Sequence, residues 1–245
     1  LWFLSEALWC VYGCKVIILI DEYDVPLENA WLCGFYSQML DFLRSLFEGA
    51  LKTNQCLEFA VMTGCLSVSK ESIFTGLNNL EIVSVLHMPY GECFGFSQEE
   101  TRLMMEYYGL QGHLEQVKEW YDGYLFGIME VYNPWSITNY VKALVSNPSE
   151  LPIPFWDNTS SNAIIKTSIE RSDISVKREL EELLAGGSIE KPVCEEITYG
   201  SICESEDSLW NFLFFTGYLK RTGMRMEGDI RYMSLAIPNR EIRYI

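Results

Sequence analysis

The sequence has 245 residues, 49% of them hydrophobic, and this composition favours a folded chain with a sizeable core over a disordered one. Eighteen Lys and Arg residues against 34 Asp and Glu residues give a net charge of −16, which argues against extensive nucleic-acid binding by this chain. No apolar run approaches the roughly 20 residues that a membrane-spanning helix needs, and the apolar start lacks the basic leader of a signal peptide.

The eight cysteines and two histidines form neither a disulfide framework nor a zinc pattern. No Cys-x-x-Cys pair occurs, and His87 and His113 are far apart in the sequence. The cysteines lie among large apolar neighbours, as at Cys65 and Cys93, and a chain of this length does not need disulfides for stability. We therefore expect reduced thiols and a cytoplasmic protein.

The first part of the chain alternates strands with a helix. Five aliphatic residues at 16–20 predict a strand buried on both faces, and further strands are predicted at 57–63 and 82–86. Apolar residues at helical spacing predict a helix over 31–51 between the first two strands. This alternation predicts an α/β fold with a parallel sheet, which we assign to residues 1–90.

The middle of the chain, residues 91–170, is predicted to be a helical subdomain. Ser97 and Glu100 have the spacing of a capping box, and a helix should follow them. Pro134 in the first turn favours another helix that begins at Asn133. The other predicted elements are a helix over 113–120, a hairpin over 126–132 and a helix over 159–169.

The last part, residues 171–245, is predicted to be a winged-helix-like α+β module. Its pattern is helix, strand, helix, strand, at 175–185, 189–199, 207–219 and 231–237.

Two acids follow the first strand, and this pattern is typical of the Walker B motif of P-loop NTPases. In that motif Asp21 would bind Mg²⁺ with the nucleotide phosphates, and Glu22 would activate water as a general base. Thr63, at the end of the second strand, is a candidate sensor of the γ-phosphate, and Asp24 is a candidate cofactor-binding or supporting acid. The simpler alternative is a buried strand that ends in two solvated acids, with a strand-end threonine beside it.

The phosphate-binding loop Gly-x-x-x-x-Gly-Lys-Ser/Thr does not occur in these residues, so we expect this chain alone not to hydrolyse ATP. The sequence starts at Leu1 in an apolar segment and stops at Ile245 within a predicted element. Both observations predict an internal piece of a longer protein.

Several segments in order along the chain resemble the bacterial AAA-ATPase-like family. They are 16–27, Thr63-Gly64, 72–79, 94–97, 120–124, 131–136, 156–162, 215–219 and 237–241.

The resemblance implies an ATPase whose Walker A loop lies upstream of these residues, often with a PD-(D/E)XK nuclease-like domain downstream. It implies the same roles for Asp21, Glu22 and Thr63, with ATP and Mg²⁺ as cofactors of the longer protein. It also implies that strands 57–63 and 82–86 either flank the gap left by a missing strand or collapse together. No arginine finger can be assigned among Arg44, Arg102 and Arg171.

Two other functions remain open at this point. The chain could be a non-catalytic protein-interaction module in which the acids are structural. Direct DNA binding by the last module would use Lys220, Arg221, Arg225 and Arg231, but the nearby acidic residues argue against it. The leading hypothesis is a nucleotide-dependent switch.

Overall fold

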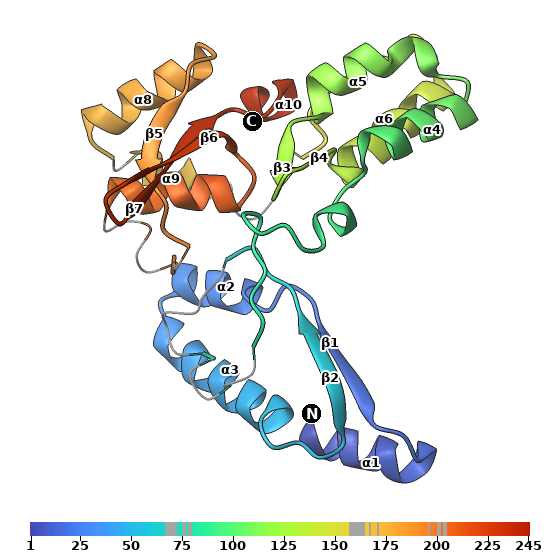
Figure 1. Cartoon of the computed structure of the whole chain (residues 1–245), viewed down its shortest axis with the longest axis vertical. Helices are drawn as coiled ribbons and strands as arrows, with labels where there is room; N and C mark the ends of the chain where they lie inside the picture. The colour runs from blue at the N-terminus through green and yellow to red at the C-terminus, as the bar shows by residue number, and fades with distance from the viewer. Residues whose placement is uncertain are drawn as a thin grey trace. The chain divides into compact units, whose positions relative to one another are not determined.

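The computed structural model describes residues 1–66, 73–74, 77, 80–156, 165–166, 168–170, 172–195, 197–199, 202 and 205–245. The chain divides into two compact units: unit 1 comprises residues 1–82 and 194–208, and unit 2 comprises residues 83–193 and 209–245. The protein is mixed α/β, with a small parallel sheet in unit 1 and antiparallel pairing in unit 2 (Figure 1). The division into parts 1–90, 91–170 and 171–245 remains a prediction.

Unit 1 is built around two paired parallel strands. Its elements in chain order are α1 (Trp2–Tyr12), β1 (Val16–Ile20), α2 (Val25–Cys33), α3 (Tyr36–Leu51) and β2 (Leu57–Met62). β1 and β2 pair from Ile17 with Phe59 to Ile20 with Met62, which confirms the strands predicted at 16–20 and 57–63. A helical connection between parallel strands is the expected crossover, because such strands cannot be joined by a tight turn.

The helix predicted over 31–51 is wrong in its extent, because two helices occupy this region. α2 already begins at Val25, with Pro26 in its first turn, where a missing N–H costs nothing. It ends at Gly34, whose φ of 80° is left-handed and stops the helix. α3 then starts at Tyr36 and buries Leu43, Phe47 and Ala50.

The prediction that strand 16–20 is buried on both faces is also wrong for the structure described. Ile17 and Leu19 are 53% and 73% exposed, and their partners Phe59 and Val61 lie on the same open face. A continuous aliphatic run indicates that burial of both faces of a strand would be favourable. It does not show which face a neighbouring element covers.

No strand forms at 82–86, so the predicted pair of strands flanking a gap is wrong for these residues. The segment is held by other hydrogen bonds instead, one of them local and one to the hairpin that contains Gly127. Ser84 N donates to His87 Nδ1 at 3.0 Å, and Val85 O accepts a 2.8 Å hydrogen bond from Gly127 N. These contacts occupy backbone groups that a sheet ladder would have used.

The first half of unit 2 is mainly helical. Ser97 and Glu100 form the predicted capping box at the start of α4 (Gln98–Tyr107), and Asn133 caps α6 (Pro134–Ser146). The other elements are η1 (Gly91–Cys93), η2 (Gln111–His113), α5 (Leu114–Tyr121) and the predicted hairpin of β3 (Tyr124–Phe126) and β4 (Met129–Val131). Their core contains Met105, Leu110, Val117, Tyr121, Tyr132, Ile137, Tyr140, Val141 and Leu144.

The second half contains a three-stranded antiparallel sheet in the order β5-β7-β6. Its elements are α8 (Ile174–Leu184), β5 (Ile189–Pro192), α9 (Glu206–Phe215), β6 (Lys220–Glu227), β7 (Ile230–Ala236) and α10 (Arg240–Tyr244). The predicted strand 189–199 is too long, and the predicted helix 207–219 stops at Phe215, because Gly217 has a left-handed φ of 86°. β6 was not predicted, and the helix predicted over 159–169 falls largely outside the described residues. The winged-helix assignment stays a prediction.

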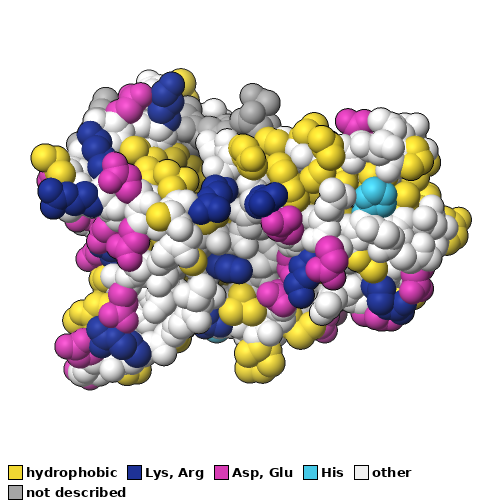
Figure 2. Space-filling model, turned by 90° about the horizontal axis from the view of Figure 1, so that it is seen from above, with side chains coloured by type: hydrophobic (Ala, Val, Ile, Leu, Met, Phe, Trp, Pro, Cys, Tyr) yellow, Lys and Arg dark blue, Asp and Glu magenta, His cyan; other side chains and the backbone are white. Residues whose placement is uncertain are grey.

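The surface carries both signs of charge. On the face in Figure 2, acidic and basic side chains are interspersed, and hydrophobic side chains lie between them.

Of the helices in the described part of the chain, none has the length and apolar character needed to cross a membrane.

Candidate functional site

The residues predicted to bind and hydrolyse nucleotide come together at one edge of the parallel sheet. Asp21 and Glu22 directly follow β1, and Thr63 directly follows β2, whose end is paired with that of β1. All three residues are exposed. In open α/β sheets the carboxyl ends of the strands are where ligands bind.

Thr63 joins the two strand ends through its side chain and its backbone. Its hydroxyl donates to Asp21 Oδ1 and accepts a 3.4 Å hydrogen bond from Glu22 N. Thr63 N donates to Ile20 O, and Thr63 O accepts from Tyr23 N, both at 2.9 Å. A movement of Thr63 would therefore change the positions of both Asp21 and Glu22.

Glu22 has an uncommon backbone conformation. Its φ is 51°, in the left-handed region that residues other than glycine rarely adopt. Glu22 O accepts a 3.2 Å hydrogen bond from Val25 N, which turns the chain into α2. Such conformations cluster at functional sites, where surrounding contacts hold them.

Asp24 lies under this edge, in the interior of unit 1. It is 1% exposed, and its carboxylate accepts hydrogen bonds from Cys65 N at 3.1 Å and Leu66 N at 2.9 Å. Tyr199 adds a third donor, its hydroxyl, at 3.3 Å. Through these contacts the Asp24 carboxylate holds the loop after β2 in place. Direct contact of Asp24 with a nucleotide remains a prediction.

Gly64 and Tyr23 pack closely around the Asp24 carboxylate. A Cβ on Gly64 would lie 2.6 Å from Asp24 Oδ1 and 2.7 Å from the Tyr23 ring, so only glycine fits. The Tyr23 hydroxyl donates to Leu66 O at 2.5 Å, and its ring meets those of Phe47 and Phe74 edge-on. The floor of the site is thus tightly packed.

Cys65 and Tyr199 were not predicted as parts of the site. Burial of the Cys65 sulfur atom, and then the nearby charge of Asp24, raise the pKa of this thiol to about 11, although the residue as a whole is exposed. Burial, followed by the charges of Asp24 and Glu28, raises the pKa of Tyr199 well above its usual range. The Cys65 thiol and the Tyr199 hydroxyl are therefore both uncharged at physiological pH, beside the Asp24 carboxylate.

The oxygen atoms at the sheet edge suit Mg²⁺ only in part. The Asp21 carboxylate and the Thr63 hydroxyl are hard donors, and Mg²⁺ typically takes one or two carboxylates together with substrate phosphates. Among the described residues, no group of three or more His, Cys, Asp and Glu could hold a metal ion alone. The chemistry present therefore fits Mg²⁺ carried with a nucleotide.

Two of the arginine-finger candidates form ion pairs with acids on their own helices. Arg44 pairs with Asp41 at 3.1 Å, and Arg102 pairs with Glu99 and Glu106 on its own helix. Arg171 lies outside the described residues.

A comparison with protein families matches the part of the chain that carries this edge. A family model described as "AAA-ATPase_like: Predicted AAA-ATPase" matches residues 3–74. A curated protein of Azotobacter chroococcum mcd 1, named "Uncharacterized protein in vnfD 5'region", is 32% identical over 128 residues. That alignment covers 51% of this chain and only 24% of the relative, and no solved structure matches significantly. The segment that carries Asp21, Glu22 and Thr63 is thus similar to the AAA-ATPase-like family.

Proposed function

We propose that unit 1 supplies the Walker B side of an ATPase site, and that the protein carrying this sequence is a nucleotide-dependent switch. The observation that carries the proposal is the hydrogen-bonded set of Asp21, Glu22 and Thr63 at the ends of two parallel strands. The family match over residues 3–74 supports the same reading.

Each residue has a separate role in this proposal. Asp21 would hold Mg²⁺ together with the nucleotide phosphates, and the ion would neutralise charge that develops on them. Glu22 would accept a proton from the attacking water. Thr63 would orient Asp21 and respond to the γ-phosphate, and Asp24 would act indirectly by holding the loop after β2.

Residues outside this chain would complete the site. A phosphate-binding loop is needed to hold ATP, because no Gly-Lys pair occurs here to supply it. The helical part and the winged-helix-like part would report the nucleotide state, and a nuclease-like domain in cis is the proposed partner.

The test is ATP hydrolysis by the full-length protein with Glu22→Gln. We expect turnover to fall at least about 100-fold while ATP binding persists, because the amide keeps the shape and loses the base. Glu58→Gln, at an exposed acid near the amino end of β2 and far along the strand from Thr63, is the matched control and should leave turnover unchanged. Equal turnover in wild type and Glu22→Gln would remove the general-base role.

The exposed apolar face of the sheet favours a second candidate, a protein-interaction module. Ile17, Leu19, Phe59 and Val61 form this face, and large exposed apolar patches often mark interaction sites. If Asp21→Asn leaves Mg-dependent ATP binding by the full-length protein intact, this second function replaces the first.

A further inference from the structure

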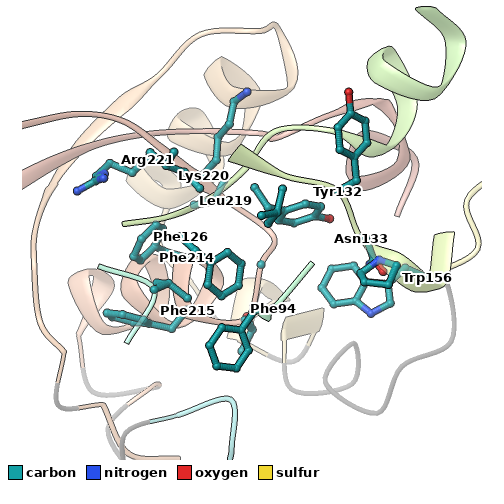
Figure 3. A pocket seen from close by; sticks show the side chains of 17 residues that line it. Phe94, Phe126, Tyr132, Asn133, Trp156, Phe214, Phe215, Leu219, Lys220 and Arg221 are labelled. Atoms are coloured by element: carbon teal, nitrogen blue, oxygen red, sulfur yellow. The ribbon is translucent and has the colours of Figure 1, made fainter. Parts of the chain in front are cut away.

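Unit 2 contains a cavity of about 260 Å³ that is lined largely by aromatic rings (Figure 3). Rings of Phe94, Phe126, Trp156, Phe214 and Phe215 surround it, and they come from four separate stretches of the chain. Phe94 and Phe126 stack with their ring centroids 5.7 Å apart and their planes 11° apart. Flat rings of this kind favour a flat aromatic guest.

The two charged side chains that line the cavity are both basic. They are Lys220 and Arg221 on β6, whose charged ends point in different directions (Figure 3), and none of the described lining residues is Asp or Glu. The chain has 34 acidic and 18 basic residues, so its composition alone would not predict a lining with two basic residues and no acidic ones. Such a lining complements a negatively charged group.

The walls are held in place by specific contacts. Phe155 N and Trp156 N donate to Glu241 Oε1 at 2.7 and 3.2 Å, and Glu241 is completely buried. Arg221 Nη2 donates to Gly127 O at 2.6 Å, which leaves its other guanidinium N–H groups for a ligand. The cavity is therefore lined by fixed residues rather than by loosely placed side chains.

We propose that the cavity binds a small planar aromatic molecule that carries a negative charge. Its aromatic body lies among the rings, and its anionic group is attracted by the positive charge that Lys220 and Arg221 supply to the lining. This site is independent of the proposed ATPase site, because all of its residues belong to unit 2.

The first test compares ligands on the unchanged chain. Isothermal titration calorimetry with 2-naphthoate should give saturable one-site binding. 2-Naphthylmethylammonium has the same rings and the opposite charge, and we expect it to bind at least about tenfold more weakly. Absence of saturable naphthoate binding at millimolar concentration, or equal binding of the two compounds, overturns the proposal.

The second test locates the site. Lys220→Met and Arg221→Met should each weaken naphthoate binding about tenfold. Arg225→Met is the matched control, since Arg225 is also on β6, pairs with Glu190 and Glu227, and does not line the cavity. Equal weakening by Arg225→Met contradicts this location. Thermal unfolding checks that each variant folds, and the ligand pair decides the matter if one does not.

Discussion

The Tyr199 hydroxyl donates a hydrogen bond to Asp24 Oδ2 at 3.3 Å, joining two residues that lie 175 positions apart in the sequence. Both residues are buried in unit 1, and Asp24 is three residues from Asp21. A remote segment therefore helps to support the acids at the end of β1.

Removal of this hydroxyl should destabilise unit 1. In Tyr199→Phe, the buried Asp24 carboxylate loses one of its donors, and we expect the free energy of unfolding to fall by about 1–3 kcal/mol. Urea unfolding followed by circular dichroism measures this change. Tyr107→Phe, at a residue 84% exposed, is the control and should have no effect. A Tyr199→Phe protein as stable as wild type would show that the bond contributes nothing.

The close packing around Gly64 gives a second prediction. Gly64→Ala would place a methyl group 2.6 Å from Asp24 Oδ1, so the loop after β2 must move, at a cost of about 1–3 kcal/mol. Gly49→Ala, within α3 and with no atom within 4 Å of its new Cβ, should instead stabilise by up to about 1 kcal/mol. Urea midpoints of the two variants should therefore shift in opposite directions.

Alkaline pH should weaken the folded state through Cys65. Its pKa is raised to about 11 in the folded chain, against about 8.5 for a free thiol, so the folded state keeps a proton that the unfolded state has lost. The contribution is complete below the unfolded pKa and disappears as pH rises through the folded pKa. Between pH 8.5 and 11, wild type should lose more stability than Cys65→Ala, as measured by urea unfolding at each pH. Parallel losses would mean that this thiol is not protected.

Glu241 should make unit 2 more stable as pH falls toward 5. Burial raises the pKa of Glu241, despite hydrogen bonds from Ser136, Phe155 N and Trp156 N that lower it. The folded state thus binds its proton more tightly, and this gain is lost as pH rises through the folded pKa. From pH 7 to 5, wild type should gain stability relative to Glu241→Gln, which cannot titrate.

Glu241→Ala serves as the companion variant. It leaves the buried donors from Ser136, Phe155 and Trp156 without an acceptor, and we expect a loss of at least about 2 kcal/mol at pH 7. Urea unfolding of both variants separates the loss of the acceptor from the loss of the charge. An alanine variant as stable as the glutamine variant would contradict the importance of these hydrogen bonds.

The sequence correctly predicted the elements whose start or turn is determined by interactions between residues close together in the chain. The capping box at Ser97, the hairpin around Gly127 and the helix that begins at Asn133 are each signalled by residues close together in the sequence. Residues 82–86 have the composition of a strand but pair with no strand in the described part of the chain, and β-structure depends on pairing that composition cannot show.

The same limit applies to the candidate site. The predicted ends of the first two strands correctly put Asp21 and Thr63 at one edge of the sheet, because parallel strands have their carboxyl ends on the same side. Nothing near Tyr199 in the sequence signals its contact with Asp24. Gly64 ends a predicted strand and belongs to a segment with family resemblance, but neither property predicts its close packing against Asp24. Contacts across many residues depend on the tertiary fold, which a single sequence shows only indirectly.

Unit 1 is discontinuous along the chain, since residues 194–208 belong to it while the stretches on both sides belong to unit 2. A recombinant piece that stops at residue 82 would therefore lack Tyr199, Ile197 and Ile202, which are all buried in unit 1. Limited proteolysis between residues 82 and 194 should leave the two fragments associated. The acids after β1 thus depend on a segment that is synthesised long after them, and unit 1 can finish folding only when that segment has emerged.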